Sequence, residues 1–244
     1  MSRFRSGDPG SGGRRRRRPL RTFVIVVIVL AGLLVAADFG AKAFAQDKVA
    51  SEIQSQGFPK KPDVSIKGFP FLTQVASRNF RQVDLSSADI PEGPVTFKSI
   101  TAVLTGVRPD SSFNGATVRQ LTGSAFITFP ELASALTSQA GALGSALGGA
   151  GLTLTAVNGS EVRANVNLVV LSGSATWRIT ETGGNKIVAR LVSISGLLSS
   201  LQGSVGNITV PIPALPLHLT IQSLSVTPDG IVGRLSGRNL SFGS

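Results

Sequence analysis

The chain has 244 residues, of which 42% are hydrophobic and 15% are charged, so it is neither a disordered tail nor a coiled coil. It contains no cysteine, which excludes disulfides, thiolate catalysis, cysteine-based zinc sites and a lipoprotein acylation site. The net charge of +11 is uneven, because residues 1–21 hold eight arginines and one aspartate while the other 223 residues hold 16 basic and 12 acidic side chains. The basic excess therefore belongs to a short N-terminal tail, which argues against a nucleic-acid-binding body.

An uncharged apolar segment of 16 residues, Thr22 to Ala37, follows the basic tail. Arginines beside such a segment are typical of the cytoplasmic flank of a membrane span. The segment would be about 24 Å long as a helix, which is shorter than the roughly 30 Å hydrocarbon core and close to the length of a signal peptide. Cleavage after Ala45, in the small-x-small sequence Ala43-Phe44-Ala45, therefore stays open. The paired arginines also resemble a twin-arginine export signal, but the rest of that pattern is absent.

The residues after the apolar segment predict a helix that continues into the body of the protein, from Phe39 to Gln56. Ala41, Ala45, Val49 and Ile53 recur at every fourth position, as one apolar helix face does. A continuous helix favours a retained anchor over a cleaved signal, and in both cases the body lies at the outer face of a bacterial cytoplasmic membrane. The predicted parts are a basic cytoplasmic tail (1–21), a transmembrane anchor or signal segment (22–38) and an extracytoplasmic domain (39–244).

After Gly57 the sequence is typical of antiparallel β-structure with one dry and one wet face. The clearest strand runs from Val162 to Val170, where apolar residues alternate with arginine and asparagine. Turn sequences stand at Gly183-Gly184-Asn185 and Pro228-Asp229-Gly230. We expect about eight strands. The candidates are 64–67, 82–85, 95–104, 117–128, 152–157, 162–170, 175–179, 187–191, 217–221 and 231–240.

Two segments of the body predict helices instead of strands. Pro130 to Leu147 has leucines near helical spacing, with proline suited to the first turn. Glu131 is its only charge, so this helix either packs beneath the sheet or lies against lipid. A shorter helix is expected at Leu197 to Leu201.

The sequence offers little for catalysis, which predicts a protein that is not an enzyme and holds no metal or cofactor. His218 is the single histidine, so a zinc site would depend on one imidazole and scattered carboxylates. There is no G-x-S-x-G motif, no phosphate loop and no close carboxylate pair in an apolar frame. A cell-envelope hydrolase would require residues that converge on His218.

Two stretches are apolar where loops are usually polar. Lys67 to Gln74 places two phenylalanines and a leucine around a glycine and a proline. One interpretation is a turn whose aromatic side chains enter the core, and the other is exposed apolar surface. Ile208 to Leu219 carries three prolines among aliphatic residues, which excludes a central strand there and leaves an edge strand or an apolar loop.

The block IKGFPFLTQVASRNFRQVDLSSADI, Ile66 to Ile90, closely resembles the signature of the actinobacterial LmeA-like phospholipid-binding family. Leu104 to Val107 and Val226 to Gly230 fit the same pattern, and the resemblance covers residues 30–240. It implies an α+β fold in which a strongly curved, mainly antiparallel sheet wraps a long helix, as in TULIP-like lipid-binding domains, and leaves an apolar groove. It also implies binding of phosphatidylinositol-type or other anionic phospholipids in support of cell-envelope lipid and lipoglycan assembly.

The partners that we expect are therefore a phospholipid ligand and the cytoplasmic membrane, with no nucleic acid. The expected lining of the groove is Phe69, Phe71, Leu72, Phe126, Phe129, Leu132 and Leu136. The expected headgroup contacts are Lys67, Arg78 and Arg81. The alternative is a non-enzymatic structural or scaffolding envelope protein that recruits a protein partner through a sheet edge and has a dry, filled interior.

Overall fold

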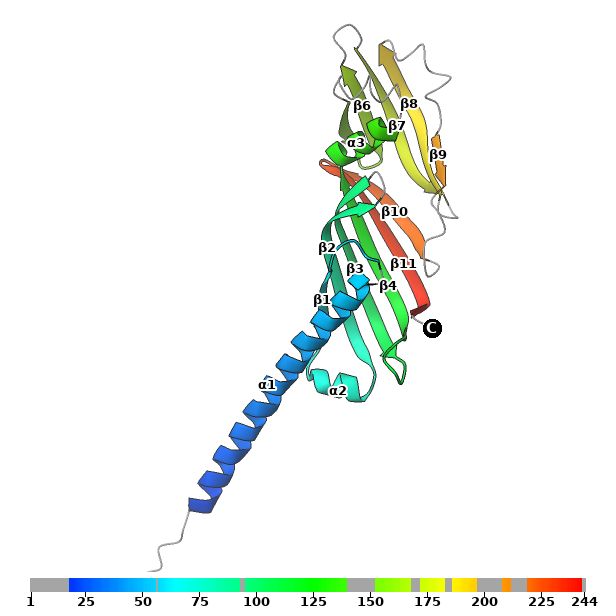
Figure 1. Ribbon diagram of the computed structural model, residues 1–244. Helices are drawn as coiled ribbons and strands as arrows, with labels where there is room; N and C mark the ends of the chain where they lie inside the picture. The colour runs from blue at the N-terminus through cyan, green and yellow to red at the C-terminus, as the bar shows by residue number, and fades with distance from the viewer. Residues whose placement is uncertain are drawn as a thin grey trace, which may run out of the picture.

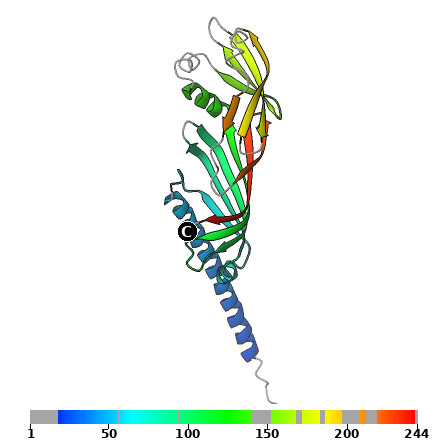
Figure 2. The same cartoon turned by 90° about the vertical axis from the view of Figure 1, so that its right-hand side faces the viewer.

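The computed structural model describes residues 18–55, 57–92, 95–139, 152–167, 172–182, 186–196, 208–211 and 219–242. The molecule is elongated, with two β-sheets arranged end to end and one long helix that projects from the end of the first sheet (Figures 1 and 2). The fold is α+β, and the strands within both sheets are antiparallel.

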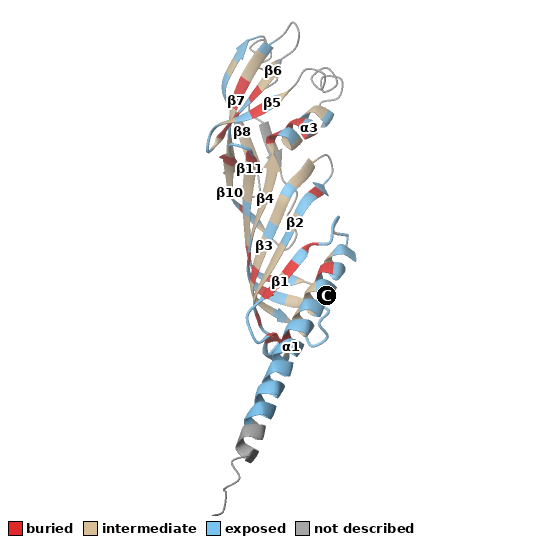
Figure 3. Ribbon diagram, turned by 90° about the vertical axis from the view of Figure 1, so that its left-hand side faces the viewer, coloured by how far each residue is buried: buried red, intermediate tan, exposed pale blue. Residues whose placement is uncertain are grey.

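The projecting helix, α1 (Arg18–Ser55), is unbroken over 38 residues, so the predicted continuation of the apolar segment into the body is confirmed. Its apolar first half is exposed (Figure 3), and Val24–Ser55 is the one helix of the described residues that is long and apolar enough to cross a membrane. In its second half, Ala41, Ala45 and Ile53 pack with the first sheet, as predicted. Val49 does not, because the buried residue at this turn of the helix is Ala50.

The first sheet has six strands in the order β1-β2-β3-β4-β11-β10. Consecutive strands β1 to β4 are neighbours, and the C-terminal hairpin β10–β11 joins them beside β4. The turn of that hairpin is Pro228-Asp229, as the sequence predicted. The strands are β1 (Asp63–Lys67), β2 (Phe80–Glu92), β3 (Val95–Pro109), β4 (Ala116–Thr128), β10 (Thr220–Thr227) and β11 (Gly230–Phe242).

The second sheet has five strands in the order β5-β6-β7-β8-β9. β9 is an edge strand that pairs only with β8, which agrees with the prolines of this apolar stretch. The expected helix at 197–201, the turn at 183–185 and His218 lie outside the described residues. The strands are β5 (Thr153–Asn158), β6 (Glu161–Asn167), β7 (Ser172–Thr182), β8 (Lys186–Gly196) and β9 (Ile208–Pro211).

The described residues thus form eleven strands, so the expectation of about eight was too low. Each of the ten candidate ranges overlaps a strand of the structure, and the apolar stretch after residue 207 adds the edge strand β9. Neither sheet is strongly curled, so the predicted wrapping of a sheet around a long helix is not confirmed.

The helix α3 (Phe129–Gln139) lies at the junction of the two sheets. It begins one residue before Pro130, as predicted, and residues 140–147 of the expected helix lie outside the described residues. Phe129 and Ala133 are buried against Leu154 and Val162 of the second sheet and Val226 of the first. α3 therefore joins the two sheets through its apolar face.

A short helix, α2 (Phe71–Ala76), is attached to α1 by the carboxylate of Asp38. The backbone N–H groups of Phe71 and Leu72 donate to the two oxygens of Asp38, at 2.8 and 2.7 Å. Pro70 precedes this helix and makes no side-chain cap, so Asp38 supplies the cap from 33 residues away. The carboxylate is buried, and it lies where the exposed apolar half of α1 ends.

The Asp38 cap gives a testable prediction. Asp38→Ala removes the acceptor of two N–H groups, of which that of Phe71 is buried, so the free energy of unfolding should fall by about 2–3 kcal/mol. Amide exchange at Phe71 and Leu72 should accelerate together with this loss. Urea unfolding and hydrogen exchange of the full chain in detergent micelles measure the two effects.

Asp47→Ala is the matched control, because Asp47 lies on the same helix in an exposed ion pair with Lys61. Such pairs contribute about 0–1 kcal/mol, so this variant should unfold nearly like the parent. Equal stability of the two variants would contradict a capping role for Asp38.

Candidate functional site

The helices α1 and α3 pack on the same face of the first sheet, which we call its inner face. The cluster beneath α1 contains Phe80, Val83 and Val107, and the cluster beneath α3 contains Val226 and Ile231. A third cluster, buried between them on the same face, is formed by Leu104, Val118, Leu121 and Leu240. The opposite face is the outer face.

An apolar strip crosses the inner face between the clusters beneath α1 and α3. Strand alternation continues the inner face from Leu104 to Ile100 and from Leu121 to Ala125. A Cβ at Gly233 would meet Leu224, and one at Gly123 would meet the Thr101 carbonyl oxygen and, farther away, Leu121 and Leu235. Every member is half-buried and outside the buried clusters. The members are Ile100, Gly123, Ala125, Leu224, Gly233 and Leu235.

The predicted lining residues near α3 lie at one end of this strip, with one exception. Phe129 is buried, Leu132 packs against the same cluster, and Leu136 is 49% exposed. Phe126 differs, because it alternates with Ala125 and therefore points to the outer face. The structure brings together three of these four residues, and Phe126 lies apart from them.

The predicted lining residues of the G-F-P-F-L block lie at the other end of the sheet, near the exposed half of α1. Phe71 is 3% exposed and packs against Phe80, with ring centroids 6.0 Å apart. Phe69 is 58% exposed and stacks on Phe39 of α1, and Leu72 is 41% exposed. Both interpretations of the block are therefore partly right, since one phenylalanine enters the core and the other lies at the surface.

A buried glutamine fixes the shape of this block. The Gln74 side chain donates to the carbonyl of Lys67 and accepts from the N–H of Arg81, each at 3.2 Å. Gly68 has a φ of +99°, and a Cβ there would stand 2.8 Å from the Gln74 amide nitrogen. The glycine is thus required both by its backbone conformation and by the glutamine that packs on it.

The three predicted headgroup residues have different surroundings. Lys67 forms an ion pair with Asp84 at 3.4 Å. Arg78 is exposed, directly after α2, with a φ of +46°. Arg81 lines a pocket on the outer face of the sheet.

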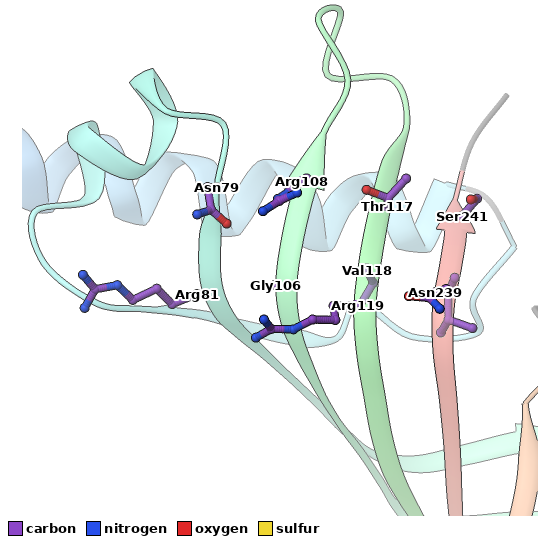
Figure 4. A pocket seen from close by; sticks show the side chains of 10 residues that line it. Asn79, Arg81, Gly106, Arg108, Thr117, Val118, Arg119, Asn239 and Ser241 are labelled. Atoms are coloured by element: carbon purple, nitrogen blue, oxygen red, sulfur yellow. The ribbon is translucent and has the colours of Figure 1, made fainter.

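This pocket, the basic pocket, has a volume of about 560 Å³ and lies on the outer face where β2, β3, β4 and β11 meet (Figure 4). Three arginines line it, Arg81, Arg108 and Arg119, and all three side chains are exposed. In the described part of the chain none of them forms an ion pair, and the lining holds no carboxylate. The other lining residues are Asn79, Gly106, Thr117, Val118, Asn239, Leu240 and Ser241.

A row of irregular strand positions directs these arginines to the outer face. Val118 and Leu121 both lie on the inner face although they are three residues apart, so Arg119 and Gln120 both point outward, as at a β-bulge. On the neighbouring strands Gly106 and Asn239 stand opposite Arg119 and have φ of +65° and +51°. A Cβ at Gly106 would lie 3.0 Å from the Arg119 Cβ, and the Arg119 side chain extends across this glycine (Figure 4).

Sequence reasoning found Arg81 but missed Arg108 and Arg119. The strand around Arg119 could be predicted from its alternating residues, but this pattern does not indicate a bulge. The register that brings the three arginines side by side is known only from the fold. Within the described residues there is no group of three or more histidines, cysteines or carboxylates that could hold a metal ion.

Comparison with known proteins identifies the family of the chain. Neither a curated protein nor a solved structure matches the chain. A family model described as LmeA-like phospholipid-binding matches residues 36–236, from the end of the exposed apolar half of α1 to β11. Since the match covers most of the sequence, the chain belongs to the LmeA-like phospholipid-binding family.

Proposed function

We propose that the protein binds a phospholipid whose acyl chains lie on the apolar strip of the inner face, beside α3. Membership of the phospholipid-binding family supports lipid binding in general. The observation that carries the proposal is the strip itself, a continuous apolar surface that stays half-exposed between two packed clusters. A fully packed core would have buried these residues.

The composition of the strip suits an acyl chain. Gly123, Ala125 and Gly233 are small, so they leave a shallow surface over the two adjacent strands β4 and β11, flanked by leucines. Each lipid methylene that leaves water for such a surface contributes about 0.8 kcal/mol to the free energy of binding. An acyl chain that places six methylenes on the strip therefore gains about 5 kcal/mol. Leu132 and the exposed Leu136 extend the apolar surface along α3.

The finer parts of the proposal concern place and role. α1 would anchor the chain in the bacterial cytoplasmic membrane. The folded body would lie outside, and the basic tail would stay in the cytoplasm. The ligand would be an anionic phospholipid, of the phosphatidylinositol type or another, held for cell-envelope lipid and lipoglycan assembly. The protein would act by binding and not by catalysis.

A bulky residue on the strip tests the lipid site. Ala125→Phe places an aromatic ring over the middle of the strip, where it should exclude two or three methylenes and weaken lipid binding about 30-fold. Native mass spectrometry of the full chain, extracted from membranes in detergent, measures how much phospholipid remains bound.

Thr122→Phe is the matched control, because this exposed residue of the same strand points to the outer face. It should keep the lipid occupancy of the parent protein. A parent chain without bound lipid, or equal loss in both variants, would contradict the proposed site, and an inaccessible, tightly packed strip would favour a scaffolding role.

Single cysteines test the orientation, since the natural chain has none. Ser193→Cys, exposed on β8, should react in intact cells with a thiol reagent that cannot cross membranes, whereas Ser6→Cys in the basic tail should react only after lysis. Both variants should remain in the membrane fraction at full length. Reaction of Ser6→Cys in intact cells, or loss of the tail, would contradict a retained anchor.

A further inference from the structure

We propose that the basic pocket on the outer face binds phosphate groups of anionic lipids in the membrane leaflet next to α1. This contact is separate from the lipid on the apolar strip, because the two surfaces lie on opposite faces of the same sheet. It rests on the proposed function only in that α1 spans a membrane. The pocket would fix the orientation of the sheet on the bilayer surface.

The charges of the pocket fit a phosphate. Arg81, Arg108 and Arg119 come from three adjacent strands and line one pocket, and each guanidinium group can donate two hydrogen bonds to phosphate oxygens. Asn79, Thr117 and Ser241 add neutral polar groups around the same opening. Of the four other cations on the strands of this sheet, Lys67 is paired with Asp84 and Lys98 with Asp89.

The position of the pocket along the sheet fits a membrane surface. Asn79 follows α2 by three residues, and Arg108 stands two residues before the β3–β4 turn. Asp38 attaches α2 to α1 where its exposed apolar half ends. The pocket therefore lies at the end of the sheet from which α1 projects toward the bilayer (Figure 1).

Exposed apolar side chains stand at the same end. Phe113, at the tip of the β3–β4 turn, is 54% exposed, and Phe69 and Leu72 are exposed beside α2. Apolar side chains next to arginines are typical of surfaces that enter the headgroup region, where rings bury apolar area and cations meet lipid phosphates. A modest tilt of α1, as is usual for membrane spans, brings the turn and the pocket closer to the bilayer surface.

The β3–β4 turn next to the pocket contains one carboxylate, that of Asp110. Asp110 accepts hydrogen bonds from the Ser112 hydroxyl and from the backbone N–H groups of Ser112 and Asn114. The Ser112 hydroxyl bond is the main cause that lowers the pKa of Asp110, so this group stays ionised and shapes the turn. Among the described residues, Asp110 forms no ion pair with the arginines of the pocket.

The experiment uses the full chain reconstituted in lipid nanodiscs, with an environment-sensitive fluorophore on Ser111→Cys in the β3–β4 turn. Discs of phosphatidylcholine are compared with discs that also contain phosphatidylglycerol, and quenching by spin-labelled lipid headgroups reports contact of the turn with the bilayer. Contact should rise in the anionic discs and fall as salt is added. Arg108→Gln with Arg119→Gln should lower the ratio of docked to undocked protein about 30-fold, since each arginine contributes a factor of about five.

Arg190→Gln with Arg234→Gln is the matched control, because it removes the same charge from exposed arginines outside the pocket. This pair should dock like the parent protein, and the circular dichroism of both pairs should be unchanged. Equal docking in neutral and anionic discs, or an equal loss in both pairs, would overturn the proposal.

Two further readouts separate this proposal from its rivals. Inorganic phosphate added to the anionic discs should release the turn no more than sodium chloride of equal ionic strength does, and a larger release by phosphate would assign the pocket to free phosphate instead. Lipid occupancy of the Arg108→Gln, Arg119→Gln pair, measured by native mass spectrometry, should match the parent protein. Loss of that bound lipid would overturn the separation of the two surfaces, whereas a lipid-free parent would count against the proposed function alone.

Discussion

The apolar inner face of a six-stranded sheet has to be shielded from water, and this requirement organises the molecule. α1 packs on it at one end, α3 packs on it at the other, and small or half-buried residues occupy the middle. Both helices serve a second purpose, since α1 continues as an exposed apolar segment and α3 connects the two sheets. The incomplete cover of this face is the feature that the proposed lipid site uses.

The attachment of α1 depends on a few buried or half-buried polar groups. Asp38 caps α2, and Gln46 accepts the N–H of Ile66 on β1. Gln74 connects Lys67, just before the G-F-P-F-L block, to Arg81 at the start of β2. In an apolar environment each of these bonds is costly to leave unmade. The helix that would enter the membrane is therefore positioned against the sheet, so its direction would determine which end of the sheet meets the bilayer.

Much of this fold could be predicted from local sequence patterns. The continuous α1, the strands of alternating residues, the turn at Pro228-Asp229 and the start of α3 all follow from periodicity and turn chemistry. The sites were harder, because they depend on which face of a strand is inward. Phe126 looked like a lining residue until the register placed it outward, while Ala125 and the glycines carried no signal of their own. The different exposure of Phe69 and Phe71 also depends on contacts distant in sequence, since Phe69 stacks on Phe39 while Phe71 packs on Phe80 and donates its N–H to Asp38.

The two faces of the first sheet would bind different parts of lipids. The inner face would hold acyl chains, while the outer face would hold phosphates of the surrounding leaflet. The most direct measurement is crosslinking of the membrane-embedded full chain with a phospholipid that carries a photoreactive group in its acyl chain, followed by peptide mapping. The account predicts adducts on the inner residues of β3, β4, β10 and β11, such as Ile100, Ala125, Leu224 and Leu235. Adducts confined to α1 and the outer face would contradict it.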